Sequence, residues 1–159
     1  MSIVIAPYSG DHFCAVRTLW REVFPDDPPR NYAEISIAAK ESEHPELFLL
    51  ALEEDRVIGS VMAGYDGHRG WLYRVAVAKA HRHSGVGAAL IREAEKRLWA
   101  LGCVKINLQV MGSNAGVTAF YRSLGYTVED RISMGKVAPD DPLGLGPLDS
   151  HPLDSSGRS

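Results

Sequence analysis

The sequence is poor in cysteine, and its cysteines stand apart. Of 159 residues only Cys14 and Cys103 are cysteines, one in a predicted amphipathic helix and one in an apolar strand. Isolated cysteines in such segments are more often buried, reduced thiols than a disulfide or a nucleophile, so we expect both to be buried. His81 and His83 alternate with no third ligand close by, and we therefore expect no metal site.

The chain also lacks an excess of positive charge and a long apolar run. Seventeen basic residues against twenty acidic ones give a net charge of −3. Nucleic-acid binding needs a concentrated basic face, so we expect no nucleic-acid partner. No apolar run reaches the roughly 18 residues of a membrane span. The opening "MSIVIAPYSG" lacks the basic and apolar parts of a signal peptide. We expect no membrane partner and a cytoplasmic location.

What the chain does contain is the composition of one globular domain, with 45% hydrophobic and 23% charged residues. All segments with a clear hydrophobic period lie within residues 1–138. From Pro139 onward the chain is rich in proline, glycine, aspartate and serine. Such a segment cannot bury enough apolar surface to offset its ordering entropy. The sequence therefore predicts a domain over 1–138 and a disordered tail over 139–159.

Hydrophobic periodicity predicts alternating strands and helices within that domain. Strands are expected over 3–7, 47–54, 56–65, 71–77 and 103–110, with one last strand or short hairpin in 126–137, and helices over 9–24, 32–41, 85–101 and 113–125. This order predicts an α/β (α+β) fold with a mixed, mostly antiparallel sheet of six to seven strands and about four helices. The helix over 85–101 connects two strands in a β-α-β crossover, which makes those strands parallel neighbours.

The stretch "RHSGVGAAL", from Arg82 to Leu90, is the strongest candidate for a binding site. A helix N-terminus offers unpaired N–H groups and a partial positive charge, both of which favour a phosphate. Gly85 and Gly87 let the backbone approach such a ligand, and Arg82 can add a cation. The alternative is a tight turn without a ligand. The stretch is neither a P-loop nor a G-x-G-x-x-G dinucleotide motif, because Leu90 occupies the third glycine position.

The loop and its surroundings resemble the GNAT family of acyl-CoA-dependent N-acetyltransferases. The family motif Arg/Gln-x-x-Gly-x-Gly/Ala is matched by Arg82 to Gly87, and Asn114 followed by "AFYRSLGY" resembles the family's Asn, Tyr and Leu-Gly-Tyr/Phe. The hairpin "AGYDGHRG" is similar to that of some bacterial members. A departure is Lys79, where the family usually has proline. The resemblance covers about residues 3–137 and implies the GNAT fold with two splayed parallel strands.

The resemblance implies acetyl-CoA as cosubstrate and a primary amine, on a small molecule or a peptide, as acceptor. The amine would attack directly in a ternary complex, and a main-chain N–H near Val77 would polarise the thioester carbonyl. The residues implied in cosubstrate binding are Val75, Ala76, Val77, Arg82, His83, Ser84, Gly85, Val86, Gly87, Ala88, Asn114 and Tyr121. Because dimers are common in the family, a homodimer is a further expectation.

Two of these residues have an alternative, structural role. Tyr121 resembles the family tyrosine that donates a proton to the departing CoA sulfur, and the ordinary pKa of tyrosine, near 10, is not far above that of a thiol. It could instead simply pack its helix on the sheet together with Phe120. Asn114 could bond the pantetheine arm or cap the helix that follows it.

The sequence does not identify the general base. Some relatives carry a carboxylate in the strand that here reads "WLYRVAV", which has none. The candidates for acceptor binding or proton removal are Glu34, Tyr65, Asp66, His68, Arg69 and Tyr73. Each has a structural alternative, such as the turn position of Asp66. The missing carboxylate also leaves a non-catalytic acyl-CoA-binding sensor as the alternative function, whereas Tyr121 favours the enzyme.

Overall fold

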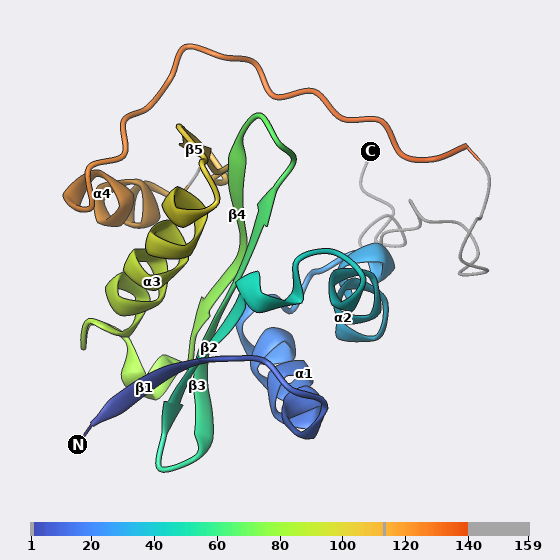
Figure 1. The fold of residues 1–159 in the computed structure, drawn as a ribbon, viewed down its shortest axis with the longest axis vertical. Helices are drawn as coiled ribbons and strands as arrows, with labels where there is room; N and C mark the ends of the chain where they lie inside the picture. Colours follow the sequence, from blue (N-terminus) through green and yellow to red (C-terminus); the bar gives the residue numbers. More distant parts are fainter. Residues whose placement is uncertain (1, 113, 140–159) are drawn as a thin grey trace, which may run out of the picture.

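The computed structural model describes residues 2–112 and 114–139 (Figure 1). One five-stranded sheet runs through them, in the order β1 (Ile3–Pro7), β2 (Phe48–Glu53), β3 (Arg56–Tyr65), β4 (Gly70–Val77) and β5 (Ile106–Asn107). The first three strand pairs are antiparallel. β4 and β5 are parallel, as expected for strands joined by a helical crossover. The mixed, mostly antiparallel sheet and its crossover are thus confirmed.

Helices cover both faces of the sheet (Figure 1). The four α-helices of the described residues are α1 (Phe13–Val23), α2 (Ala33–Glu41), α3 (Val86–Ala100) and α4 (Ala115–Ser123). α1 and α2 bury Val16, Trp20 and Ile37 against one face, together with Phe48 of β2. α3 buries its apolar stripe on the other face, against residues such as Val61 and Leu72. We call these two clusters the α1 core and the α3 core.

The expected count of six to seven strands is wrong, because residues 126–137 form no strand in the described chain. The side chains of Val128, Ile132 and Met134 are 67–90% exposed there. Among the described residues, the hydrogen bonds that join this segment to the region around β5 come from side chains, as in the ion pair between Lys105 and Glu129. The alternation of apolar residues in 126–137 predicted a strand, but the backbone of this segment pairs with no strand among the described residues.

β5 is also much shorter than the predicted strand over 103–110. Its pairing with β4 consists of Gly70 with Ile106 and Trp71 with Asn107. Beyond these two pairs β4 has no strand neighbour on that side among the described residues. The parallel strands therefore meet only at the start of β4, and the remainder of its edge is unpaired by strands.

Of the two cysteines, Cys103 is buried as expected, but Cys14 is exposed. The stripe of α1 that packs on the sheet is formed by Val16, Leu19 and Trp20. Position 14 lies on the opposite side of the helix, which explains the error. Of the predicted tail, residues 140–159 lie outside the described residues. In the described part of the chain, no helix is long and apolar enough to cross a membrane.

Candidate active site

The centre of the candidate site is the carboxyl-terminal half of β4. Val75 and Val77 pack toward the α3 core, whereas Ala76 between them belongs to the α1 core. On one side this half of the strand pairs with β3, through Ser60 with Ala76 and Gly59 with Val77. Its other side is the edge that β5 leaves free. Free backbone groups on a strand edge can pair with an extended ligand as though it were another strand.

β4 contains a bulge immediately before this half. Its register with β3 shifts between Met62 opposite Tyr73 and Ser60 opposite Ala76, so that Arg74 and Val75 together oppose one residue. Arg74 has a φ of +53°, in the left-handed region. Such a conformation costs on the order of 1–3 kcal/mol for a residue with a side chain and persists only where the surroundings impose it.

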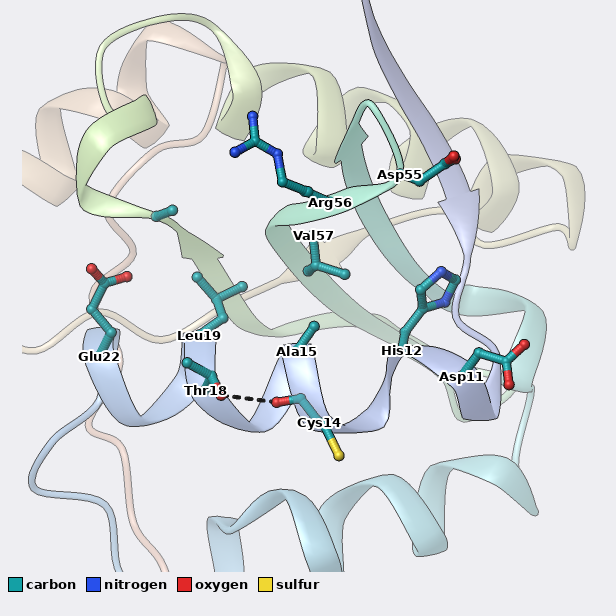
Figure 2. A pocket seen from close by; sticks show the side chains of 11 residues that line it. Asp11, His12, Cys14, Ala15, Thr18, Leu19, Glu22, Asp55, Arg56 and Val57 are labelled. Carbon is teal, nitrogen blue, oxygen red and sulfur yellow. Dashed lines mark hydrogen bonds between the residues drawn. The ribbon is translucent and has the colours of Figure 1, made fainter.

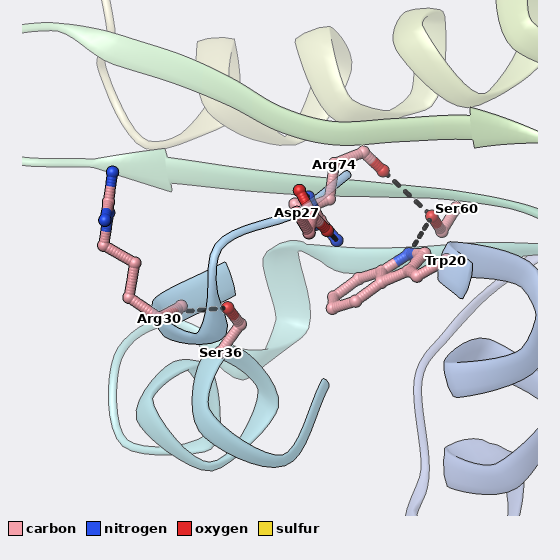
Figure 3. A network of polar contacts seen from close by, with 6 residues as sticks. All are labelled: Trp20, Asp27, Arg30, Ser36, Ser60 and Arg74. Carbon is pink, nitrogen blue, oxygen red and sulfur yellow. Dashed lines mark hydrogen bonds and ion pairs between the residues drawn. The ribbon is translucent and has the colours of Figure 1, made fainter. Parts of the chain in front are cut away.

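The surroundings of Arg74 do impose it (Figure 3). The guanidinium donates two hydrogen bonds to Asp27, at 3.1 and 2.5 Å, and lies 4.4 and 4.1 Å from the ring centroids of Trp20 and Phe24. The Arg74 carbonyl accepts a hydrogen bond from the Ser60 hydroxyl at 2.9 Å, and that hydroxyl accepts one from the Trp20 indole N–H, also at 2.9 Å. This group was not predicted, because its one local signal in the sequence is an arginine inside an apolar strand.

The glycine loop lies between β4 and α3. Residues 82–85 are exposed, and the backbone turns through the left-handed region at His83 (φ +62°) and Gly85 (φ +86°). The backbone N–H groups of residues 83–88 have no acceptor among the described residues, and the first bond of the helix joins the Ala89 N–H to the Gly85 carbonyl at 3.0 Å. A Cβ added to Gly85 would meet nothing within 4 Å. The loop thus presents unpaired donors at the helix N-terminus, of which those of residues 83–85 lie in its exposed part.

Gly87 has a different role from Gly85. A Cβ there would lie 3.2 Å from Cζ of Phe120 and 3.6 Å from Cγ2 of Val77. The missing side chain therefore lets α4 and β4 pack closely on the first turn of α3. This packing brings the helix that carries Tyr121 beside the loop.

A buried contact anchors the start of the loop. His81 Nε2 lies 2.8 Å from Oε2 of Glu53, whose side chain is only 7% exposed. Arg56 approaches the same carboxylate at 3.6 Å, and the Ser84 hydroxyl donates to the His81 carbonyl. The two histidines thus diverge, His81 toward β2 and His83 into the exposed loop. Among residues 2–112 and 114–139, no group of three or more His, Cys, Asp or Glu side chains could hold a metal ion.

Tyr121 is buried in the α3 core, with 8% of its surface exposed. Its ring meets Phe120 and Tyr126 edge to face, at centroid distances of 5.1 and 5.7 Å. Burial raises the pKa of Tyr121 to about 12. The phenol therefore stays protonated at neutral pH and is available as a donor. Tyr121 therefore packs its helix on the sheet together with Phe120, and its role as a proton donor stays a prediction.

Asn114 caps α4. Its side-chain oxygen accepts a hydrogen bond from the Val117 N–H at 3.2 Å. The capping alternative for Asn114 is therefore observed, and a contact to a pantetheine arm stays a prediction.

The hairpin between β3 and β4 is held by Asp66. Its Oδ1 accepts the N–H groups of Arg69 at 2.7 Å and His68 at 2.8 Å, and these bonds lower the pKa of the carboxyl group. At the start of β4, Tyr73 is half-exposed and stacks on Trp71 with ring centroids 6.3 Å apart. Burial, and secondarily the charge of Asp66, raises the pKa of Tyr73. The carboxylate of Asp66 thus stabilises the turn, which is the structural role considered for it above.

The predicted acceptor residues do not form one cluster. Tyr65 packs against the α3 core, whereas Tyr73 follows the alternation of β4 onto the opposite face of the sheet. Glu34 lies in the first turn of α2, and its carboxylate contacts Arg17 and Arg21 of α1 at 3.4 and 3.8 Å. The structure therefore gives Glu34 a role in joining the two helices.

A separate groove of about 540 Å³ lies between α1 and the turn that joins β2 to β3 (Figure 2). Its lining residues are Asp11, His12, Cys14, Ala15, Thr18, Leu19, Glu22, Asp55, Arg56, Val57 and Ala78. None of them is a predicted site residue. The groove approaches the candidate site at Ala78, directly after β4, and at Arg56, which contacts the Glu53 carboxylate beside His81.

The described residues thus form a mixed α/β sheet covered by helices on both faces, in which the parallel strands part after two residue pairs and a helix N-terminus follows β4. Residues 13–126 match the sequence model of the Acetyltransferase (GNAT) family. The chain belongs to this family.

Curated relatives agree with that assignment. The chain is 43% identical to the acetyltransferase ECA0875 of Pectobacterium atrosepticum over 136 residues, which cover 84% of this chain and 94% of the relative. It is 42% identical to the acetyltransferase SG1711 of Sodalis glossinidius over 130 residues, covering 80% and 89%. Among solved structures, the PaiA N-acetyltransferase of Thermoplasma acidophilum, solved with coenzyme A, superposes with a TM-score of 0.67 at 24% identity, covering 83% and 94%. That likeness shows the fold.

Proposed function

We propose that the chain moves the acetyl group of acetyl-CoA to a primary amine, by direct attack of the amine in a ternary complex. The observation that carries this proposal is the row of unpaired N–H groups over residues 83–88, directly after a strand with a free edge. A doubly charged pyrophosphate suits such donors at a helix N-terminus. Arg82 is exposed and makes no ion pair within the described residues, so its charge is available to the same anion.

The cosubstrate is extended, and the site offers an extended surface. The loop residues Arg82, His83, Ser84, Gly85, Val86, Gly87 and Ala88 hold the pyrophosphate, and the β4 residues Val75, Ala76 and Val77 pair with the pantetheine amides. We place Asn114, the N-cap residue of α4, and Tyr121 of α4 beside the same space, because Phe120 of this helix lies 3.2 Å from the position of a Cβ on Gly87. The thioester then lies along the edge of β4 that β5 leaves free, with a main-chain N–H near Val77 as donor to its carbonyl oxygen.

Tyr121 is the catalytic residue of this proposal. The amine nitrogen forms a bond to the carbonyl carbon, the carbon–sulfur bond breaks, and the proton lost by the amine balances the proton gained by the sulfur. Because burial raises the pKa of Tyr121 to about 12, its phenol holds its proton more firmly than a thiol, whose ordinary pKa is about 8.5. The Tyr121 hydroxyl therefore stabilises the departing thiolate chiefly by donating a hydrogen bond.

The acceptor enters from the hairpin end of β4. The resemblance of "GYDGHRG" to the hairpin of certain bacterial family members supports a role for this turn in acceptor choice. Its exposed residues Asp66 and His68 and its half-buried Arg69, with Tyr65 and Tyr73 beside them, offer charges and donors to a small-molecule or peptide amine. Arg69 suits an acceptor with a carboxylate group.

The experiment is a pair of measurements on the wild-type chain. Calorimetric titration with acetyl-CoA reports binding, and release of free thiol with a panel of amines reports turnover. We expect binding, with turnover for at least one amine. Binding without turnover on any amine would favour the acyl-CoA-binding sensor, and no binding at millimolar acetyl-CoA would refute the proposal.

A further inference from the structure

A group of buried and partly buried polar contacts lies next to β4, on the face of the sheet that α1 covers. It consists of Trp20, Asp27, Ser60 and Arg74, and we call it the Arg74 unit (Figure 3). It connects α1, the segment after α1, β3 and β4. Its four side chains lie on the α1 side of the sheet, so none belongs to the proposed cosubstrate site. Arg74, however, directly precedes Val75, the first residue proposed to pair with the pantetheine.

The bulge at Arg74 decides which face of the sheet the following residues occupy. Side chains alternate between faces along a regular strand. Leu72 belongs to the α3 core, so without a bulge Val75 and Val77 would face the α1 core. Both instead pack toward the α3 core, and Ala76 packs in the α1 core. The extra residue at the bulge therefore inverts the strand and turns Val77 toward the first turn of α3, where its Cγ2 would lie 3.6 Å from a Cβ on Gly87.

Contacts to both the backbone and the side chain hold Arg74 in its left-handed conformation. The hydrogen bond from Ser60 fixes the carbonyl, and Asp27 fixes the guanidinium through two bonds. The side chains of Arg74 and Asp27 are only 12% and 15% exposed, so solvent screens the pair weakly. Lysine cannot reproduce the planar fork or its stacking on Trp20.

We propose that the Arg74 unit positions the catalytic half of β4, so that Asp27, Ser60 and Arg74 are positioning residues for acetyl transfer. The inference rests on the proposed function. The unit acts on the strand edge beside the thioester and does not touch the loop that holds the pyrophosphate. Loosening the unit therefore lowers kcat while cosubstrate affinity is kept, since small misplacement of reacting groups is costly in rate.

The test uses Ser60→Ala and Asp27→Asn. The first removes the hydroxyl that bonds the Arg74 carbonyl, and the second keeps the shape of Asp27 but removes its charge. Arg74→Lys is the third variant, which retains charge and loses the fork. Glu93→Gln is the matched control, because it weakens the Glu93–Arg97 ion pair on α3, outside the unit. Each variant is assayed well below its melting temperature for kcat, KM and calorimetric Kd for acetyl-CoA. Hydrogen exchange of the peptide spanning residues 71–78 is measured in the free protein.

We expect kcat to fall at least tenfold in Ser60→Ala and Asp27→Asn, with Kd for acetyl-CoA within threefold of wild type. Exchange over residues 71–78 should accelerate in both and stay unchanged in Glu93→Gln. If both variants fold and show the control's kcat and exchange, the inference is overturned. If either variant does not fold, Arg74→Lys carries the same comparison. An inactive wild-type chain would refute the proposed function, whereas faster exchange over residues 71–78 would still support the positioning of β4.

Discussion

At the scale of single residues, the candidate site depends on side chains and glycines whose properties are set by the residues around them. Tyr121 is the main example, because burial in the α3 core raises its pKa to about 12. Gly85 and Gly87 are only two residues apart, yet one is required by its backbone conformation and the other by close packing. The family motif asks for glycine at the first position and for glycine or alanine at the second, and does not distinguish these two requirements.

Replacing Tyr121 by phenylalanine tests its role as a donor. The Phe variant keeps the ring packing on Phe120 and Tyr126 and loses only the hydroxyl. A hydrogen bond to a charged sulfur is worth about 1.5–3 kcal/mol, so we expect kcat to fall roughly 10- to 100-fold with little change in the Kd for acetyl-CoA. Tyr126→Phe is the control, since its hydroxyl is bonded to Glu95 at 2.7 Å. Equal kcat values in the two variants would mean that Tyr121 serves packing alone.

The same tyrosine makes stability depend on pH in the alkaline range. The pKa of Tyr121 is raised in the folded state, from about 10 to about 12. Folding therefore favours the neutral phenol. The resulting contribution to the free energy of unfolding is present in full below pH 10 and is lost as the pH rises toward 12. Its size is on the order of 2–3 kcal/mol. Denaturant unfolding at pH 9 and pH 11.5 should show a smaller loss of stability in Tyr121→Phe than in wild type. An equal loss of stability in Tyr121→Phe and wild type would show that the pKa of Tyr121 is not raised by folding.

Gly85 offers a sharp test of the loop, because the chain contains a matched glycine. Gly85 and Gly102 both have positive φ, +86° and +90°, and an added Cβ would meet nothing at either position. Alanine should therefore cost a similar 1–2 kcal/mol of unfolding free energy at each. Only Gly85→Ala should also raise the KM for acetyl-CoA, by several-fold. A similar KM in both variants would place the pyrophosphate elsewhere.

At the scale of elements, a few tertiary contacts fix the loop and the strand edge. α3 supplies the donors, α4 is brought to it by the absence of a side chain at Gly87, and β2 holds the loop through Glu53 and His81. β4 is shaped from the opposite face by the Arg74 unit. Contacts on different faces of the sheet thus fix the two halves of the proposed cosubstrate site, the loop and the edge of β4.

The Glu53–His81 contact predicts a variant with the opposite kinetic signature to the Arg74 unit. Glu53→Gln removes the buried charge opposite His81 and should loosen the loop, which raises the KM for acetyl-CoA several-fold and leaves kcat within about twofold. Glu54→Gln, next to it in the exposed turn, is the control. Steady-state kinetics measure both values. A fall in kcat at unchanged KM would show that Glu53 does not act through the loop.

At the scale of the whole molecule, much of the fold could be predicted from sequence because its signals are local. Helix and strand periods, and the glycines after an apolar strand, lie within short stretches such as 71–101. The Arg74 unit could not be predicted, because it joins residues as distant as Trp20 and Arg74. The strand expected in 126–137 was wrong for the same reason. Its apolar alternation is local, but a strand exists only where a partner edge accepts it.

The layered arrangement gives β4 its central place. It is the strand that pairs on one side with the antiparallel part of the sheet and begins, on the other side, the parallel pair with β5. Its residues contribute to both cores, with Ala76 in one and Leu72 in the other. A substitution in either core can therefore alter the position of β4, and with it the candidate site.

The most direct test of the account is a titration of the ¹⁵N-labelled chain with coenzyme A, followed through the backbone amide resonances. If the loop holds the pyrophosphate, the largest shifts fall on the amides of residues 83–88, with smaller ones along Val75 to Val77. Binding that leaves the amides of residues 83–88 unshifted, and instead perturbs the groove beside α1, would contradict it.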